Sequence, residues 1–145
     1  MNGTKNEDPV MFEMIGEKKF KISYNSALLE DHLMDYLAVP EEKRPGQMRK
    51  LLCASVAGCF TASVYMALST MGVKINSLKG TAAAFSAEDI GSLPKIKAVD
   101  IKVEIDIDDK DSDIFEEVKK IFEKGCLITR SISPAIKVTH SISRI

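Results

Sequence analysis

Hydrophobic and polar residues alternate along several short segments of this chain. Residues 10–14 and 20–24 each alternate apolar with polar side chains on either side of Gly16-Glu17-Lys18. They therefore predict a hairpin with one buried face. The clearest alternation, at 99–107, sets Val and Ile against Asp, Lys and Glu and predicts a sheet with one solvated face. Weaker patterns predict strands at 73–85 and at 135–145.

Elsewhere the apolar residues recur every three or four positions, which is the spacing of helices. After a cap at Asn25 or Ser26, leucines and a methionine predict a short helix over 25–37, which Pro40 ends. Residues 41–46 are predicted as a charged loop. Residues 47–71 then predict one long helix, ended by Gly72.

A second amphipathic helix is predicted downstream. Asp113 and Glu116 have the spacing of a capping box, with Asp in place of Ser or Thr, and Gly125 ends the apolar stripe that follows. Residues 126–133 predict a short turn or helix. We expect residues 1–9 to be disordered and 88–94 to form a loop, because neither segment has an apolar pattern.

The predicted elements alternate between strands and helices in an irregular order. Helices that interrupt a largely antiparallel set of strands are typical of the α+β class. We therefore predict a single domain over 10–145, in which an antiparallel β-sheet wraps a long central helix. A chain of 145 residues can bury a core without a disulfide or a metal.

Composition excludes some functions. The net charge is −1 and the basic residues are scattered, so no nucleic-acid partner is expected. The first 25 residues lack the long apolar run of a secretory signal. The chain also has 3 cysteines, an odd number. These features indicate a reducing compartment, the cytoplasm, where cysteines are more often catalytic or inert than paired.

Residues 51–73 contain no Asp, Glu, Lys, Arg or His and are long enough to cross a bilayer. One hypothesis is therefore a membrane-anchored protein. The segment is, however, rich in Ala, Gly, Ser and Thr, which favours a helix packed by protein on all sides, and no membrane partner is expected. Because one small sheet cannot cover every face of such a helix, we expect a homodimer.

Two of the three cysteines are candidates for a functional site. Cys59 lies in the middle of the uncharged helix, and Cys126 follows the second amphipathic helix. Cys53 is six residues before Cys59, about 120° around the helix and roughly 9 Å along it, so it is interpreted as core. Whether Cys59 and Cys126 meet decides between a dithiol site and two buried thiols, since a free cysteine is most often a small buried hydrophobe.

The stretch from Leu51 to Cys59, with its Gly58-Cys59 ending, resembles the osmotically inducible protein C and organic hydroperoxide resistance family (OsmC/Ohr). Cys126 with the following Leu-Ile-Thr-Arg-Ser-Ile is similar to that family's second cysteine segment. The resemblance covers about residues 47–145. It implies an OsmC-like fold, an intertwined homodimer and a thiol peroxidase with Cys59 as the peroxidatic and Cys126 as the resolving thiol.

The resemblance also implies the partners. An organic hydroperoxide would be the substrate and an external thiol the reductant, and no cofactor is expected. Cys59 would become a sulfenic acid that condenses with Cys126 to an intramolecular disulfide. A second hypothesis is a non-catalytic protein of the same fold that binds a small apolar ligand at the dimer interface.

The peroxidatic thiol must ionise, so a cation beside Cys59 is expected. Arg44 and Lys18 are the candidates, together with Arg130. Arg49 is about 15 Å from Cys59 along the helix, too far to serve it. The family has a catalytic Glu about ten residues before the first cysteine, and this chain has no acid there. Glu42, further back in the sequence, is the candidate acid. The family's catalytic Arg lies near the hairpin, where this chain carries Lys18.

Other polar residues are interpreted as structural. His140 is expected in the core and His32 in solvent. Two histidines and no Cys-x-x-Cys argue against a zinc site. The aspartates at 106, 108, 109, 111 and 113 are interpreted as a solvated strand end and helix cap, with weak cation binding as the alternative.

Overall fold

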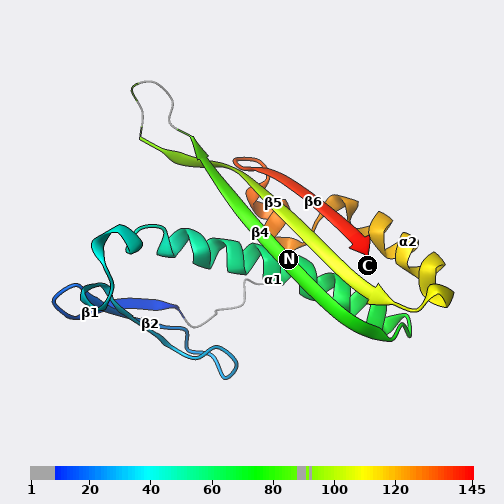
Figure 1. Cartoon of the computed structure of the whole chain (residues 1–145), viewed down its shortest axis with the longest axis horizontal. Coiled ribbons are helices and arrows are strands. Elements are labelled where there is room, and N and C mark those ends of the chain that lie inside the picture. Colours follow the sequence, from blue (N-terminus) through cyan, green and yellow to red (C-terminus); the bar gives the residue numbers. More distant parts are fainter. Residues whose placement is uncertain (1–8, 88–90, 92) are drawn as a thin grey trace, which may run out of the picture. The chain divides into compact units, whose positions relative to one another are not determined.

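A computed structural model describes residues 9–87, 91 and 93–145. The chain divides into two compact units, Met1–Gln47 and Met48–Ile145, and each is described by itself (Figure 1). The predicted disorder of 1–9 falls almost wholly outside the described residues, and so does much of the predicted loop at 88–94.

The first unit is an antiparallel sheet in the order β1-β2-β3. Strands β1 (Met11–Gly16) and β2 (Lys19–Ser23) confirm the predicted hairpin. The unit continues with β3 (His32–Asp35) and two 3-10 helices, η1 (Tyr36–Ala38) and η2 (Glu41–Lys43). The predicted charged loop at 41–46 therefore contains one turn of 3-10 helix.

The alternation predicted that one face of this hairpin is buried, and the structure shows that this is wrong. Only Ile22 and Ser23 of this pair of strands are buried, and Met14 is 72% exposed. Phe20 is held by Phe12 at a ring distance of 5.0 Å and by Tyr36 at 5.9 Å. The strand pattern was right, but the first unit supplies too few apolar side chains of its own to cover it.

The predicted helix over 25–37 is wrong. Asn25 has a φ of +49°, and the Ser26 hydroxyl accepts the N–H groups of Leu28 and Leu29, so the chain turns here. Residues 32–35 then pair with β2. Leu28 is 91% exposed, so the helical spacing of the leucines had no core to pack against, and strand pairing satisfied the backbone instead.

The second unit begins with α1 (Gln47–Thr70) and the hairpin of β4 (Ile75–Ala87) and β5 (Lys95–Ile107). Two helices, α2 (Ser112–Ile121) and α3 (Leu127–Ile132), lead to β6 (Lys137–Arg144). Two 3-10 turns, η3 (Asp109–Asp111) and η4 (Phe122–Lys124), flank α2. The predicted long helix, amphipathic helix and three strands are all present, and the α+β class is confirmed.

The sheet of the second unit has the order β4-β5-β6 and is mixed. In Figure 1 the yellow β5 lies between the green β4 and the red β6. β4 and β5 are antiparallel, as predicted, but β5 and β6 are parallel, which corrects the expected antiparallel sheet. The reason is the long connection through α2 and α3, since a parallel neighbour needs a crossover of this kind.

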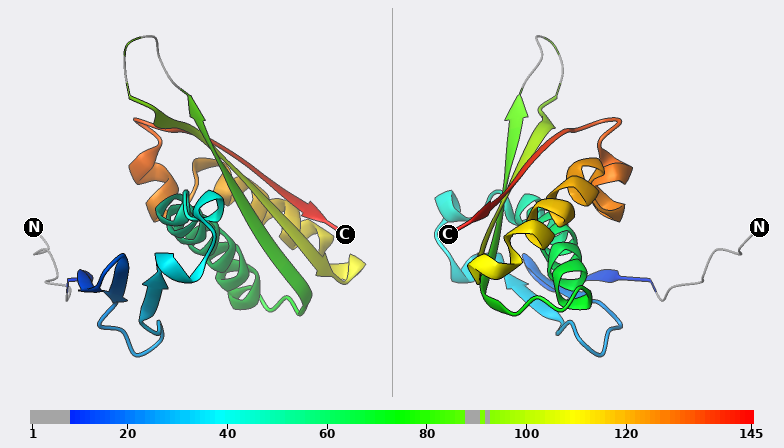
Figure 2. Two further views of the ribbon diagram at one scale, coloured as in Figure 1. Left: turned by 60° about the vertical axis from the view of Figure 1, so that its left-hand side comes forward. Right: turned by 90° about the vertical axis from the view of Figure 1, so that its right-hand side faces the viewer.

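One face of this sheet carries the core. The aliphatic residues of β5 pack against α1 and α2, and Figure 2 shows both helices on the same side of the sheet. Lys102 and Glu104 point from the other face to solvent, as the alternation predicted. The side chains that α1 buries completely are Val56, Phe60, Val64 and Leu68.

The buried residues of α1 recur every fourth position and form one stripe. The helix was predicted to be packed by protein on all sides, and within this chain it is not. Tyr65 and Met66 are exposed. The segment Glu41–Thr70 contains an 18-residue stretch with a mean hydropathy of 1.8, so it is long and apolar enough to cross a membrane by length and composition. A completely buried stripe against a sheet is also what the core helix of a soluble protein has.

The two ends of the helical segments differ in how well the sequence predicted them. Gly72 has a φ of +82° and ends α1 as expected. The capping box predicted at Asp113 is wrong, because the helix begins one residue earlier and no side chain caps it. Asp113 therefore lies in the first turn, where its charge favours the helix dipole.

Candidate functional site

Cys59 and Cys126 come together in the second unit. Cys59 lies on α1 and is half-buried, whereas Cys126 is the residue before α3 and is 4% exposed. The two thiols hydrogen-bond each other. α1 presents Cys59 beside the core residue Phe60, and the turn after α2 returns the chain so that Cys126 meets it.

Thr129 organises the environment of Cys126. Its hydroxyl oxygen accepts the N–H of Cys126 at 2.8 Å. The same hydroxyl lies 3.2 Å from the Cys126 carbonyl oxygen and 3.5 Å from Cys126 Sγ, so its single proton can be donated to either. The backbone N–H groups of Ile128 and Thr129 also reach the Cys126 sulfur.

These contacts separate the pKa values of the two thiols. Burial raises the pKa of Cys126, but hydrogen bonds from Thr129, Cys59 and the two amides outweigh burial and leave that pKa below its ordinary value of 9.0. Burial raises the pKa of Cys59, and the bond to Cys126 raises it further, against the backbone amides of Ile128 and Leu127. Of the two thiols, Cys126 is therefore the one whose ionised form its surroundings favour more.

We expected a cation beside Cys59. Among the described residues, no Lys or Arg is one of the groups that shift the pKa of Cys59. Arg130 donates from Nε to the Cys126 carbonyl oxygen at 3.4 Å, and so contacts the backbone of the second cysteine. Arg49 donates from Nη1 to the Ser86 hydroxyl at 3.0 Å, which ties α1 to β4. Cys53 is a half-buried free thiol on α1.

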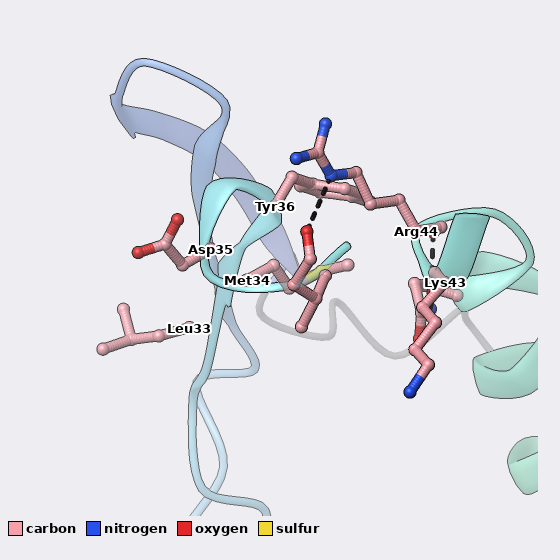
Figure 3. A pocket seen from close by; sticks show the side chains of 8 residues that line it. Leu33, Met34, Asp35, Tyr36, Lys43 and Arg44 are labelled. Carbon is pink, nitrogen blue, oxygen red and sulfur yellow. Dashed lines mark hydrogen bonds between the residues drawn. The ribbon is translucent and has the colours of Figure 1, made fainter. Parts of the chain in front are cut away.

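Lys18 and Arg44 come together in the first unit. Both line one pocket with Tyr36 and Glu41, and Arg44 and Tyr36 also line a neighbouring cavity of about 220 Å³. Figure 3 shows Arg44 extending along Tyr36, where its Nε donates to the Val39 carbonyl oxygen at 3.1 Å. Glu42 lies on η2 and is exposed, and it is Glu41 that lines the pocket.

The histidines and aspartates lie away from a metal-like arrangement. His140 stacks on Phe60 at 4.8 Å, with Nε2 3.3 Å from the Glu123 carbonyl oxygen, and His32 pairs with the Tyr24 hydroxyl at 3.0 Å. Asp109 binds Arg144 at 2.6 Å. Within residues 9–87, 91 and 93–145, no cluster of three or more His, Cys, Asp or Glu could hold a metal ion.

Sequence reasoning missed Thr129. The signal was present, because a residue that precedes a short helix and a Thr three positions later have the spacing of a capping box. The structure has this reciprocal arrangement between Cys126 and Thr129. It was missed because cysteine is an unusual residue at that position.

Comparison with known proteins gives the family and the fold. The family model described as OsmC-like protein matches residues 49–141. Among solved structures, an OsmC like protein from Mycoplasma pneumoniae has 14% identity and a TM-score of 0.71, covering 98% of this chain and 99% of its own. A search of the curated proteins gave no match.

Two other solved structures carry functional descriptions. An organic hydroperoxide resistance protein from Elizabethkingia anophelis has 14% identity and a TM-score of 0.63, covering 98% of this chain and all of its own. An organic hydroperoxide resistance protein OsmC from Legionella pneumophila has 18% identity and a TM-score of 0.61, covering 96% and 99%. Identities this low show a shared fold alone.

Proposed function

Since this chain belongs to the OsmC-like protein family, we propose that it is a thiol-dependent peroxidase that reduces organic hydroperoxides. The observation that carries the proposal is the contact between the Cys59 and Cys126 thiols. Such a pair can take two electrons from one thiol and resolve the product with the other. Solved structures of the same fold are described as organic hydroperoxide resistance proteins, which supports the substrate class.

The proposed cycle has three steps. The Cys59 sulfur attacks the outer oxygen of R–O–O–H, so that the S–O bond forms, the O–O bond breaks and ROH leaves. Cys126 then attacks the Cys59 sulfenic acid, and the disulfide forms with loss of water. An external dithiol, or two monothiols, reduces the disulfide and restores both cysteines while being oxidised itself.

Burial favours this order of attack. Cys59 is half-buried and therefore more accessible to a peroxide than Cys126, which is 4% exposed. A buried thiol in contact with Cys59 needs no access to substrate, because it reacts only with the sulfenic acid beside it. We therefore assign Cys59 as the peroxidatic thiol and Cys126 as the resolving one.

The proposed working form is a cytoplasmic homodimer. Three free thiols, of which two are to cycle through a disulfide, need a reducing compartment and a thiol reductant. The first unit leaves large apolar side chains uncovered, a feature typical of surfaces that bind a partner. Those exposed most are Leu28, Met14, Leu33, Val10 and Leu29. The dimer also offers a place for Lys18, Arg44 or Glu42 to act on a thiol of the partner subunit.

The test is a titration of the reduced protein with cumene hydroperoxide, followed by disulfide mapping by mass spectrometry. We expect one Cys59–Cys126 disulfide for each peroxide consumed, and a slower reaction with hydrogen peroxide. Cys59→Ser should abolish peroxide consumption. Cys126→Ser should form no disulfide, and whatever sulfenic acid forms on Cys59, at whatever rate, should persist until dimedone traps it.

Cys53→Ser is the matched control, because it removes a thiol from the same helix and should leave the reaction unchanged. Slow oxidation of all three cysteines without preference would refute the peroxidase. That result would favour the alternative, a non-catalytic OsmC-like protein that binds a small apolar ligand at the dimer interface.

A further inference from the structure

Cys59 must lose its proton before it attacks a peroxide, and the structure offers an acceptor. We propose that Cys126 accepts this proton as a thiolate, and that Thr129 is the positioning residue that holds Cys126 for the task. The inference rests on the proposed function, and it gives Cys126 a role before the disulfide step as well as in it.

The geometry around Cys126 is that of a built acceptor. The Cys59 thiol, the Thr129 hydroxyl and the amides of Ile128 and Thr129 all direct hydrogen-bond donors to one sulfur. A sulfur surrounded by donors is stabilised when it is negative, because each bond to a charged acceptor is stronger than its neutral counterpart. Direct contact with Cys59 then gives the proton a path of a single hydrogen bond.

Gly125 makes room for Thr129. A Cβ at position 125 would overlap the Thr129 hydroxyl, and the φ of +81° at Gly125 is one that other residues rarely adopt. Thr129 is itself 3% exposed, so water cannot replace its hydroxyl easily. The segment from Gly125 to Thr129 is therefore shaped so that this one hydroxyl reaches Cys126.

The titratable groups on the surrounding elements do not offer a better acceptor. α1 contributes Cys59, and α3 contributes Arg130, which contacts the Cys126 carbonyl oxygen rather than its sulfur. From η4 come Glu123 and Lys124, both exposed. On β6, His140 directs Nε2 to the Glu123 carbonyl oxygen. The hydrogen bonds to Cys126 lower its pKa despite burial, which is the direction that a proton acceptor needs.

The proton balance closes over the whole cycle. The Cys126 thiolate takes the proton of Cys59, whose sulfur attacks the outer oxygen of ROOH to form the sulfenic acid and an alkoxide, RO⁻. The Cys126 thiol returns the proton to RO⁻, which leaves as ROH. Cys126 is a thiolate again and attacks the Cys59 sulfur, displacing hydroxide as the disulfide forms.

The experiment measures the Cys126 thiolate without peroxide. In a Cys53→Ser/Cys59→Ser protein, Cys126 is the remaining thiol, and the ultraviolet absorbance of its thiolate reports its titration. We expect Thr129→Val, which has the same shape but no hydroxyl, to move the midpoint to higher pH. Thr129→Ser keeps the hydroxyl and should keep the midpoint at its original pH. If Thr129 served packing alone, Thr129→Val would not move the midpoint.

A second measurement does not depend on Thr129. Cys126 in the Cys53→Ser/Cys59→Ser protein should titrate below Cys59 in the Cys53→Ser/Cys126→Ser protein. The reverse order would overturn the inference even if Thr129→Val failed to fold. With peroxide, Thr129→Val should slow sulfenic acid formation on Cys59 about tenfold near neutral pH, because a hydrogen bond to a charged group is lost.

The two proposals fail separately. If the wild-type chain formed no disulfide with cumene hydroperoxide, yet Thr129→Val shifted the titration, the peroxidase would be wrong, and only the stabilisation of the Cys126 thiolate by Thr129 would stand. If peroxide reacted normally in Thr129→Val and the midpoint did not move, the inference would be overturned and the peroxidase would stand.

Discussion

The two units of the chain differ in how much of their own apolar surface they cover. In residues 48–145, a helical stripe, a sheet face and α2 bury one another, and Phe60 is completely inaccessible. In residues 9–47, Ile22 is the one buried hydrophobic among the described residues, and the leucines of the turn face outward. The second unit therefore has its own core, whereas the first leaves most of its large apolar side chains exposed.

This difference matters for function because chemistry needs fixed geometry. The cysteine pair lies in the unit that packs itself, where core contacts hold both sulfurs. The candidate cations Lys18 and Arg44 lie in the unit that does not. The thiol pair is therefore held by contacts within one chain, whereas the exposed side chains of the first unit are where the proposed second copy would bind.

The largest expected effect is on the core of the second unit. Phe60→Ala should lower the free energy of unfolding by about 3–5 kcal/mol, because it leaves a cavity between α1 and the sheet. Phe85→Ala is the matched control, since Phe85 lies on β4 and is 56% exposed; a change of about 0.5 kcal/mol or less is expected there. Urea denaturation of both variants under reducing conditions tests this, and equal losses would contradict a core confined to one sheet face.

The next effect tests what covers the first unit. If a second copy buries β1, Met14→Lys should weaken self-association about tenfold or more, because burying a methionine contributes about 1.5–3 kcal/mol. Glu13→Lys places the same side chain on the neighbouring position, which faces the other way in the strand, and should change less. Analytical ultracentrifugation over a range of concentrations measures both. If the wild-type chain were monomeric at every concentration, a second copy could not be what buries β1.

A smaller effect concerns the crossing of α1 over β4. A methyl group at Gly80 would overlap the Thr61 side chain, so Gly80→Ala should destabilise the fold by about 1–3 kcal/mol. Gly58→Ala adds the same group on α1 where nothing lies within 4 Å, and should stabilise the helix by up to about 1 kcal/mol. Thermal denaturation should give shifts of opposite sign. Adding Thr61→Ala to Gly80→Ala should recover part of the loss, whereas strict additivity would show that the two residues do not meet.

The smallest effect is a pH dependence whose sign differs between the two thiols. Cys126 has a pKa below its unfolded value near 9.0, so the unfolded chain binds more protons, and the contribution of Cys126 to stability grows as pH rises toward 9.0. It is lost as pH falls through the folded pKa. Cys59 has a raised pKa, so its contribution is lost as pH rises above 9.0.

Single-cysteine proteins measure these two slopes. The unfolding free energies of Cys53→Ser/Cys59→Ser and Cys53→Ser/Cys126→Ser, each compared with the protein in which all three cysteines are Ser, should diverge as pH rises. Parallel curves would show that the two thiols share one environment. Reversed slopes would exchange the assignments of charge within the pair.

The sequence by itself determined those elements whose own pattern of apolar residues is enough to identify them. The alternation at 99–107 predicted β5, because every second side chain had to face a core, and the uncharged run at 51–73 predicted most of α1, because a long apolar segment must be buried. The same run, with its Gly58-Cys59 ending, and the segment after Gly125 indicated the family. The sequence also singled out Cys59 and Cys126 as a candidate pair, although it left their contact open.

Tertiary structure alone decided the features that depend on distant partners. The leucines of 25–37 had helical spacing, but residues 32–35 gained backbone hydrogen bonds from β2, which no local pattern encodes. β6 is parallel to β5 because α2 and α3 occupy the crossover. The charge on the thiol pair was decided in the same way. A thiol's pKa is set by the donors that surround it, and Thr129 could be recognised as one only when the turn after Gly125 brought its hydroxyl to Cys126.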